Sequence, residues 1–341
     1  MSAGAAPSRP LTALLEVDEL SVDFRVRGEW VRAVDSASFR IAPGETVGLV
    51  GESGSGKSVT SLALMGLLPP HTSRVSAKGL HFEGRDLLNL SRREIEDLRG
   101  NEVAMIFQDP MSSLNPAFTV GDQIAETIRR HRRCSRRDAR AAAVQALDEV
   151  GIPNAARRVG SYPHEFSGGM RQRVMIAIAL SCDPKLLIAD EPTTALDVTI
   201  QAQILDLIRD LREEHHTSIL FITHDLGVVA DLCDRVIVMY AGEIVEEAPV
   251  FDLFGAPNHP YSSALLRSMP VITGDGADLN VIPGALPPPG GRPAGCRFGP
   301  RCEHHAESCD TPIDLTETGD GRSVRCVRAD QLDLALAGGR R

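Results

Sequence analysis

The sequence predicts an α/β fold: a mostly parallel sheet flanked by helices, with an antiparallel β subdomain, an inserted helical subdomain and a small loop-rich C-terminal domain. Three observations predict it. Apolar strand-like segments alternate with helix-like segments, which produces a mostly parallel sheet. A helical block at residues 110–165 interrupts that alternation, and a Pro- and Gly-rich stretch at 283–295 precedes a cluster of cysteines. A chain of 341 residues is long enough for one large domain and an appended piece.

The first strands carry the pattern of an antiparallel sheet. Residues 14–17, 20–26 and 33–41 alternate apolar and polar side chains, as strands with one buried face do. Residues 45–50 form a buried strand that runs into a glycine-rich turn, and residues 57–68 are expected to form the helix that follows.

The central part of the chain returns to strands after the helical block. An apolar strand at 103–107 ends at Gln108, and within the block Ser135 and Asp138 are spaced like a capping box. Further strand signals lie at 185–190, 218–223 and 235–240. We therefore assign residues 13–255 to the main domain, with 110–165 as its helical subdomain, and 256–341 to the C-terminal domain.

The composition is that of a soluble globular protein, with 43% hydrophobic and 24% charged residues. Asp and Glu number 46 against 36 Lys and Arg, a net charge of −10, so we expect no nucleic-acid partner, because phosphate contacts need positive surface. No apolar run approaches the roughly 20 residues of a membrane span. Residues 1–12 lack a signal-peptide pattern and are expected to form a disordered tail. We expect a cytoplasmic protein that reaches any membrane through partners.

A phosphate-binding loop is predicted at residues 51–58, GESGSGKS, which fit G-x-x-x-x-G-K-[ST] between a strand and a helix. The glycines let backbone N–H groups turn toward a phosphate, and the helix N-terminus adds positive potential. Lys57 would reach the β- and γ-phosphates, and Ser58 would bind Mg²⁺. The predicted phosphate-binding residues are Gly51, Ser53, Gly54, Ser55, Gly56, Lys57 and Ser58.

Two acids end the apolar strand at 185–190. Asp190 suits a Mg²⁺ role at the C-terminal end of the strand, where ligands of open α/β sheets gather, and Glu191 is placed to polarise an attacking water. A third motif, at residues 166–173, places Ser167 as the N-cap of a helix before two glycines.

In this order, the motifs resemble those of ABC ATPases over about residues 14–250. The resemblance implies the P-loop NTPase fold of an ABC ATPase, with ATP and Mg²⁺ as cofactors. Phe166 and Met170 stand where the commonest signature has Leu and Gln. The matching elements are the phosphate loop, Gln108, the signature residues Ser167, Gly168 and Gly169, the Asp190–Glu191 pair, the loop Ala195-Leu196-Asp197, and His224.

The resemblance assigns roles to individual residues. Gln108 would touch Mg²⁺ and the attacking water, and His224 would contact the γ-phosphate. An aromatic residue near the first strand would stack on adenine; Phe24 is the expected residue and Trp30 the alternative. The signature residues 167–169 would act on ATP held by a second ABC ATPase subunit, either a homologue or a copy of this chain.

The glutamine-loop segment 107–116 and the tail motifs at 259–261 and 282–284 resemble the ATP-binding subunits of oligopeptide/dipeptide importers. This resemblance implies transmembrane permease subunits as partners, an extracytoplasmic solute-binding protein acting indirectly, and a peripheral position on the cytoplasmic membrane face. An importer of nickel or sugars with the same machinery remains open. A soluble ABC ATPase acting on nucleic acid or ribosomes is disfavoured by the single nucleotide domain, the lack of coiled coils and the acidic charge.

Four of the seven cysteines, Cys296, Cys302, Cys309 and Cys326, lie near the C-terminus. Their spacing, C-x5-C-x6-C-x16-C, lacks the paired short spacings of common zinc ribbons. The importer branch it resembles carries a [4Fe–4S] cluster there, so we expect that cluster, with zinc as the alternative and free thiols as the third reading. His304 and His305 are candidate substitute ligands. Because the cluster lies outside the nucleotide motifs, its expected role is structural or in docking a partner.

A basic patch is predicted in this acidic chain. Seven arginines fall between residues 129 and 140: Arg129, Arg130, Arg132, Arg133, Arg136, Arg137 and Arg140. They fit either solvated helix faces or contact with anionic headgroups and acidic partner loops.

Overall fold

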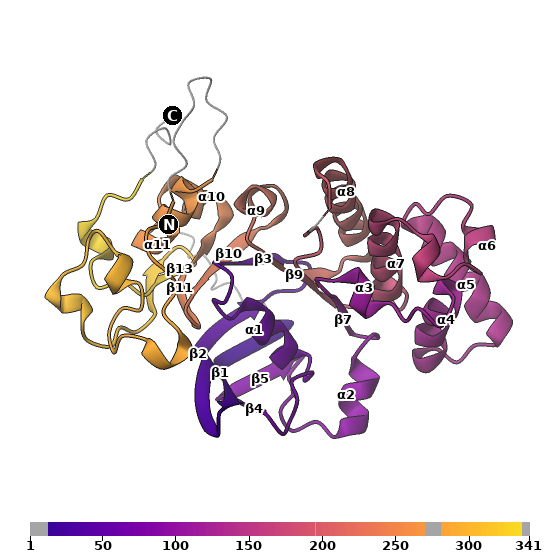
Figure 1. Ribbon diagram of the computed structural model, residues 1–341, viewed down its shortest axis with the longest axis horizontal. Helices are drawn as coiled ribbons and strands as arrows, with labels where there is room; N and C mark the ends of the chain where they lie inside the picture. Colours follow the sequence, from indigo (N-terminus) through magenta and orange to yellow (C-terminus); the bar gives the residue numbers. More distant parts are fainter. Residues whose placement is uncertain (1–12, 195, 270–280, 336–341) are drawn as a thin grey trace, which may run out of the picture.

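The computed structural model describes residues 13–194, 196–269 and 281–335, and an eight-stranded sheet forms its centre (Figure 1). The strands are β3 (Thr46–Val50), β7 (Val103–Ile106), β8 (Leu186–Asp190), β9 (Ser218–Thr223), β10 (Arg235–Tyr240), β11 (Glu243–Pro249), β12 (Thr316–Gly319) and β13 (Arg322–Val324). Their order is β12-β13-β11-β10-β3-β9-β8-β7. The strands from β10 to β7 run parallel, and β11, β13 and β12 add an antiparallel edge.

The parallel strands β3, β8 and β9 are buried along their whole length. Strands covered on both faces are apolar at every position, which is why these segments lack alternation in the sequence. The predicted tail at 1–12, and Ala195 of the Ala195-Leu196-Asp197 loop, lie outside the described residues.

An antiparallel sheet with its own apolar core forms the β subdomain. Its strands are β1 (Leu15–Val26), β2 (Glu29–Ile41), β4 (Ser73–Ser76), β5 (Gly79–Phe82) and β6 (Arg85–Asp86). The expected pair of segments at 14–17 and 20–26 is one strand with an irregular register at Glu19, whose φ of 52° is left-handed. Arg27 and Gly28 also have positive φ, as a two-residue hairpin turn requires.

Helices cover the main sheet and form a lobe at one end (Figure 1). They are α1 (Lys57–Leu64), α2 (Arg92–Leu98), α3 (Pro110–Ser113), α4 (Val120–His131), α5 (Arg136–Glu149), α6 (Ala155–Arg158), α7 (Gly168–Leu180), α8 (Val198–His215), α9 (Leu226–Leu232), α10 (Val250–Gly255) and α11 (Pro260–Arg267). Ser135 caps α5 by accepting the Asp138 N–H. None of these helices is both long and apolar enough to cross a membrane.

Helix α1 is shorter than the sequence predicted. It ends at Leu64, because Gly66 takes a φ of +60° and the Leu67 N–H bonds back to the Leu62 carbonyl at 2.8 Å. A glycine in the left-handed conformation is a common helix terminator.

The C-terminal domain lies at the opposite end from the helical lobe (Figure 1). It contains short 3₁₀ turns and one hairpin, β12–β13, which pairs with β11 and so extends the main sheet. No pattern in the sequence predicted this hairpin. Tyr240, Tyr261 and Phe298 pack ring against ring, with centroids 4.6 to 5.3 Å apart, and join the domain to β10. The predicted α/β architecture with an antiparallel subdomain and a helical insertion is confirmed.

Glu246 on β11 anchors the start of α11 and the hairpin. Its fully buried carboxylate accepts the N–H groups of Asn258 (2.6 Å) and His259 (2.9 Å), and lies 3.6 Å from the Arg322 guanidinium on β13. Burial raises the pKa of Glu246, while the hydrogen bonds favour its charged form. Removing the carboxylate would leave buried donors without a partner.

Replacing Glu246 by Ala is therefore expected to lower the free energy of unfolding by about 2–4 kcal/mol. The midpoint of guanidinium unfolding, at an unchanged m value, measures the change. Glu317→Ala on the exposed edge strand β12 is the control and should cost less than about 0.5 kcal/mol. Equal midpoints for the two variants would contradict the anchoring role.

Candidate nucleotide site

The predicted phosphate loop joins the end of β3 to the start of α1. Gly51 has a φ of 151°, and a Cβ there would lie 2.1 Å from the Met239 carbonyl oxygen, so a side chain cannot be accommodated. Gly56 has a φ of 112°, which L side chains rarely adopt. The turn that would wrap a phosphate therefore depends on these glycines.

Lys57 and Ser58 open α1 with their side chains turned toward the loop and β8. The Lys57 ammonium is buried and donates to the carbonyls of Gly51 (2.7 Å) and Glu52 (3.1 Å). Burial lowers the pKa of Lys57, and the nearby carboxylates of Glu191 and Asp190 oppose that shift. The cation is placed to exchange carbonyl partners for phosphate oxygens.

Asp190 meets the phosphate loop at the end of β8. Its carboxylate accepts the hydroxyls of Ser58 at 3.1 Å and Ser61 at 3.4 Å, and the residue is 4% exposed. Burial raises the pKa of Asp190, and the Ser58 hydrogen bond lowers it. A hydroxyl and a carboxylate at this position are oxygen donors of the kind Mg²⁺ prefers.

Glu191 lies at the meeting point of three loops. The Gln108 amide and the Thr194 hydroxyl each donate to Glu191 Oε2 at 2.9 Å, and His224 Nδ1 lies 3.4 Å from Oε1. Glu191 has a φ of 47°, a strained conformation for a residue with a side chain. Gln108, Glu191 and His224 each follow a parallel strand, β7, β8 and β9 respectively, so adjacent strand ends bring them together.

A cleft of about 190 Å³ lies between the phosphate loop and the Gln108–Glu191 pair, and neither Asp190 nor His224 is among the described residues that line it. From the predicted set it is lined by Ser53, Gly54, Gly56, Lys57, Ser58, Gln108 and Glu191. Ser55 is fully buried behind the loop. The lining also includes Pro289 and Arg292 of the C-terminal domain, which the sequence analysis missed. No local motif marks these two residues, which are more than 200 positions from the phosphate loop.

The signature residues lie elsewhere. Ser167 caps α7 by accepting the Met170 N–H, and a Cβ on Gly169 would lie 2.6 Å from Ile200 of α8, so the signature packs on that helix. Among the described residues, neither Ser167, Gly168 nor Gly169 lines the cleft at Lys57. One chain thus separates its signature from its own phosphate loop.

The two aromatic candidates for adenine stacking lie on the β1–β2 hairpin, outside the lining of that cleft. Phe24 is half-buried and packs on the core of the β subdomain. The Trp30 ring is covered by the Arg74 guanidinium, 3.7 Å from the ring centroid. Part of Phe24 is exposed, whereas Arg74 already occupies one face of the Trp30 ring. Phe24 is therefore the candidate with more free ring surface.

The four clustered cysteines line one small cavity in the C-terminal domain, together with His259, His304 and His305. Burial raises the pKa of Cys296 to about 11, and its neighbours Cys302 and Cys326 add to that rise. His305 Nε2 lies 3.0 Å from Asp310 Oδ1. Within residues 13–194, 196–269 and 281–335, no three or more His, Cys, Asp or Glu side chains are placed to hold a metal ion.

Comparison with known proteins places this arrangement in a family. The model of the ABC transporter family matches residues 34–194, and that of the oligopeptide/dipeptide transporter C-terminal region matches 245–309. The oligopeptide transport ATP-binding protein AppD of Bacillus subtilis is 53% identical over 318 residues, which cover 93% of this chain and 97% of AppD. A Brucella abortus protein named for peptide import and ATP binding is 52% identical over 313 residues, covering 92% of this chain and 94% of that protein.

Solved structures agree with the sequence matches. The ATP-binding cassette MJ0796, a dimer in a post-hydrolysis state with ADP and Pi, superposes with a TM-score of 0.60 at 26% identity, covering 69% of this chain and 98% of that chain. The protein cbiO1 of Clostridium perfringens superposes with a TM-score of 0.59 at 27% identity, covering 71% and 90%. This chain therefore belongs to the ABC transporter family, among the ATP-binding proteins of oligopeptide and dipeptide transporters, and is an ATPase.

Proposed function

We propose that this chain hydrolyses ATP to power the import of dipeptides or oligopeptides. The observation that carries the proposal is the convergence of Gln108, Glu191 and His224 beside the phosphate loop, in a chain whose C-terminal region matches that of oligopeptide/dipeptide transporters. AppD, whose name states oligopeptide transport, matches nearly the whole length of this chain.

The proposal gives each predicted site residue a task. Lys57 and the backbone of residues 51–56 bind the phosphates, and Ser58, Asp190 and Gln108 would hold Mg²⁺, which supplies charge neutralisation at the phosphates. The donors Gln108 and Thr194 hold one oxygen of Glu191 in place, so that its carboxylate can orient and polarise the attacking water. His224, 3.4 Å from the other oxygen, would contact the γ-phosphate, and Phe24 would stack on adenine.

A second ABC ATPase subunit completes the site. Since Ser167, Gly168 and Gly169 are remote from the cleft of their own chain, they would face ATP bound by the partner, which is a homologue or a copy of this chain. Closure of the ATP-bound dimer would move the transmembrane permease subunits, and hydrolysis would reset them. The chain would then lie peripherally on the cytoplasmic face of the membrane, with the extracytoplasmic solute-binding protein as an indirect partner.

Transport by reconstituted vesicles tests this function. The chain would be combined with transmembrane permease subunits of a peptide importer and with their binding protein, and uptake of a labelled tripeptide would be followed. We expect ATP-dependent uptake that Glu191→Gln abolishes. Uptake of Ni²⁺ or a disaccharide in place of the peptide would contradict peptide import but keep the transport ATPase. ATP hydrolysis without uptake of any of these solutes would contradict the importer assignment.

We further propose that Cys296, Cys302, Cys309 and Cys326 ligate a [4Fe–4S] cluster, with zinc as the alternative. The support is that all four thiols line one cavity, together with the buried His259. When bound, the cluster would supply four iron–thiolate bonds that cross-link this part of the chain.

The seven arginines of residues 129–140 form an exposed basic patch on α4, α5 and the segment between them. Two of them are paired: Arg130 with Asp97 at 2.6 Å, and Arg132 with Asp183. The other five have no ion pair within the described part of the chain. We propose that this patch contacts anionic headgroups or acidic loops of the permease.

Replacing Arg129, Arg133, Arg136 and Arg137 by Gln is expected to weaken association with anionic vesicles by up to about 10³-fold, since each basic residue near such a surface contributes about 1 kcal/mol. Co-sedimentation with phosphatidylserine vesicles, or with permease vesicles, at several salt concentrations measures the change. Arg92 and Arg93, an adjacent exposed pair that opens α2, provide a control when both are replaced by Gln. Equal sedimentation of the two variants would indicate that the seven arginines lie on solvated helix faces and do not contact the membrane or the permease.

A further inference from the structure

The C-terminal domain lies directly against the phosphate loop. Arg301, whose side chain is 6% exposed, pairs with the Glu52 carboxylate at 3.0 Å. The Glu52 N–H in turn donates to the Tyr261 hydroxyl at 2.9 Å. Leu286 lies 3.5 Å from the position of a Cβ on Gly54. Glu52 and one face of Gly54 are therefore held by a domain that follows them by more than 200 positions.

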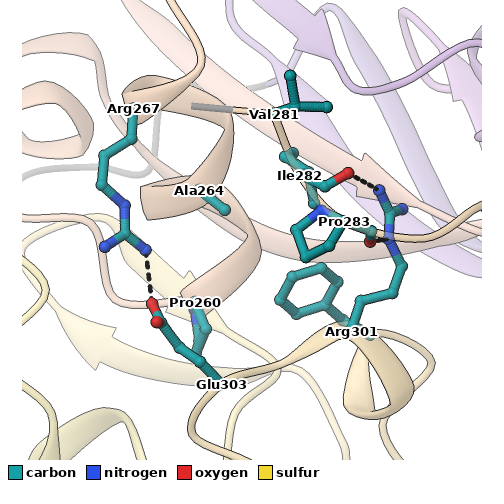
Figure 2. Close-up of a pocket in the computed structure, with 9 residues that line it drawn as sticks. Pro260, Ala264, Arg267, Val281, Ile282, Pro283, Arg301 and Glu303 are labelled. Carbon is teal, nitrogen blue, oxygen red and sulfur yellow. Dashed lines mark hydrogen bonds and ion pairs between the residues drawn. The ribbon is translucent and has the colours of Figure 1, made fainter. Parts of the chain in front are cut away.

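Arg301 also fixes the course of the segment that crosses the loop. Figure 2 shows its guanidinium directed at the carbonyls of Ile282 and Pro283, at 3.3 and 2.8 Å. These bonds, with the Glu52 pair, use its N–H donors on three sides. The segment that begins at Ile282 then runs past the phosphate loop and brings Pro289 and Arg292 to the nucleotide cleft.

Arg292 reaches that cleft with most of its donors unused. Its Nη2 donates to the Ala33 carbonyl at 3.0 Å, but Nε and Nη1 are buried and have no hydrogen-bond partner among the described residues. Burial, with the nearby Arg297, lowers the pKa of Arg292 to about 10, while Asp35 and Glu243 oppose the shift. The group is thus still a cation at neutral pH.

The guanidinium of the neighbouring Arg297, in contrast to that of Arg292, has both carboxylate and carbonyl partners. It pairs with Asp35, lies 3.1 Å from Glu243, and donates to the Ala241 carbonyl at 2.7 Å. Arg297 therefore takes the carboxylates that Arg292 could otherwise use. A buried guanidinium with unpaired donors is unfavourable, and an anion in the adjoining cleft would offset part of that cost.

We propose that Arg292 is a nucleotide-binding residue that donates to the phosphate groups of ATP and ADP, making the C-terminal domain one wall of the nucleotide site. A guanidinium presents N–H groups in a planar fork that matches phosphate oxygens, and Arg292 shares its cleft with Lys57 and Ser58. Arg292 would contact the nucleotide bound by its own chain, whereas the signature residues would contact the nucleotide bound by the partner subunit.

Nucleotide titration by calorimetry tests the proposal, with ADP for the full chain and with ATP in a Glu191→Gln background that prevents turnover. Arg292→Gln is expected to weaken both nucleotides by about 10- to 100-fold, the value of a hydrogen bond to a charged group. Arg292→Lys should recover part of that loss, because it keeps the charge without the fork. The nucleotide-free protein should melt within a few degrees of wild type, since the variant loses the Nη2 hydrogen bond to the Ala33 carbonyl but relieves the unpaired Nε and Nη1.

Arg267→Gln is the matched control: it removes a guanidinium of the same domain that pairs with Glu303 at 2.9 Å, on the rim of the pocket in Figure 2. It should leave nucleotide affinity unchanged, whereas Lys57→Ala should weaken binding, which shows that the assay responds. Wild-type affinity in Arg292→Gln would overturn the proposal. So would a loss of affinity that comes with a lower melting temperature of the free protein and no recovery in Arg292→Lys, because that pattern marks a structural wall.

Discussion

Glu191→Gln is expected to lower ATP turnover by about 10²–10⁴-fold while ATP affinity stays close to that of the unmodified chain. The amide keeps the volume of the carboxylate and one acceptor oxygen, so the cleft keeps its shape. It cannot polarise water as a carboxylate does. Because Ser58, Asp190 and Lys57 are unchanged, the bound state survives and ATP-bound dimers should accumulate.

Single-turnover phosphate release and equilibrium nucleotide binding separate these effects, using the partner subunit where the homodimer does not form. Lys57→Ala is the contrasting variant: it removes a buried cation that lines the cleft and that we propose binds the phosphates, so binding itself should weaken. Turnover of Glu191→Gln near the wild-type rate would remove Glu191 from its catalytic role. A large loss of ATP affinity in Glu191→Gln would show that its carboxylate serves binding instead.

Cys302→Ser is expected to abolish iron binding and to open the C-terminal domain to proteases. Residues from 283 onward include many Pro and Gly and few large apolar side chains, so little apolar area is buried there to offset the entropy of ordering the chain. Purified without oxygen, the unmodified protein should be brown, with about four iron and four sulfide per chain.

Iron and sulfide analysis, the absorption spectrum and limited proteolysis measure this prediction. Cys134→Ser, at a partly buried cysteine in the helical lobe, is the control and should keep colour and resistance. Colourless anaerobic protein with one zinc per chain would replace the iron–sulfur proposal with the zinc alternative, and protein without metal would contradict both.

The Cys302→Ser variant also tests whether the four cysteines influence the nucleotide site. The sequence analysis expected a role apart from catalysis, because the cysteines lie outside the nucleotide motifs. In the structure, Arg292 and Arg301 lie within ten residues of Cys296 along the chain. Arg292 lines the nucleotide cleft, and Arg301 pairs with Glu52. If the domain opens in Cys302→Ser, nucleotide affinity should fall by about as much as it does in Arg292→Gln.

The sequence by itself determined the chemistry of the nucleotide site. Its motifs are local: a phosphate loop needs glycines, a lysine and a hydroxyl within eight residues, and Asp190 and Glu191 directly follow a strand of continuous apolar residues. Strand–loop–helix order then predicts that the ends of adjacent parallel strands meet, as Gln108, Glu191 and His224 do. Short-range pattern and strand order carry enough information for this part.

Tertiary structure decided how remote segments complete and surround that site. The Arg301–Glu52 pair, the Arg292 side chain in the cleft beside Ala33 and the pairing of β13 with β11 join residues 76 to 259 positions apart. No periodicity marks such contacts, because an arginine in a Pro- and Gly-rich loop has the same local pattern whether it faces solvent or a buried cleft. The packing of Tyr240, Tyr261 and Phe298 sets where the C-terminal domain lies on the sheet. That position decides which group such an arginine contacts.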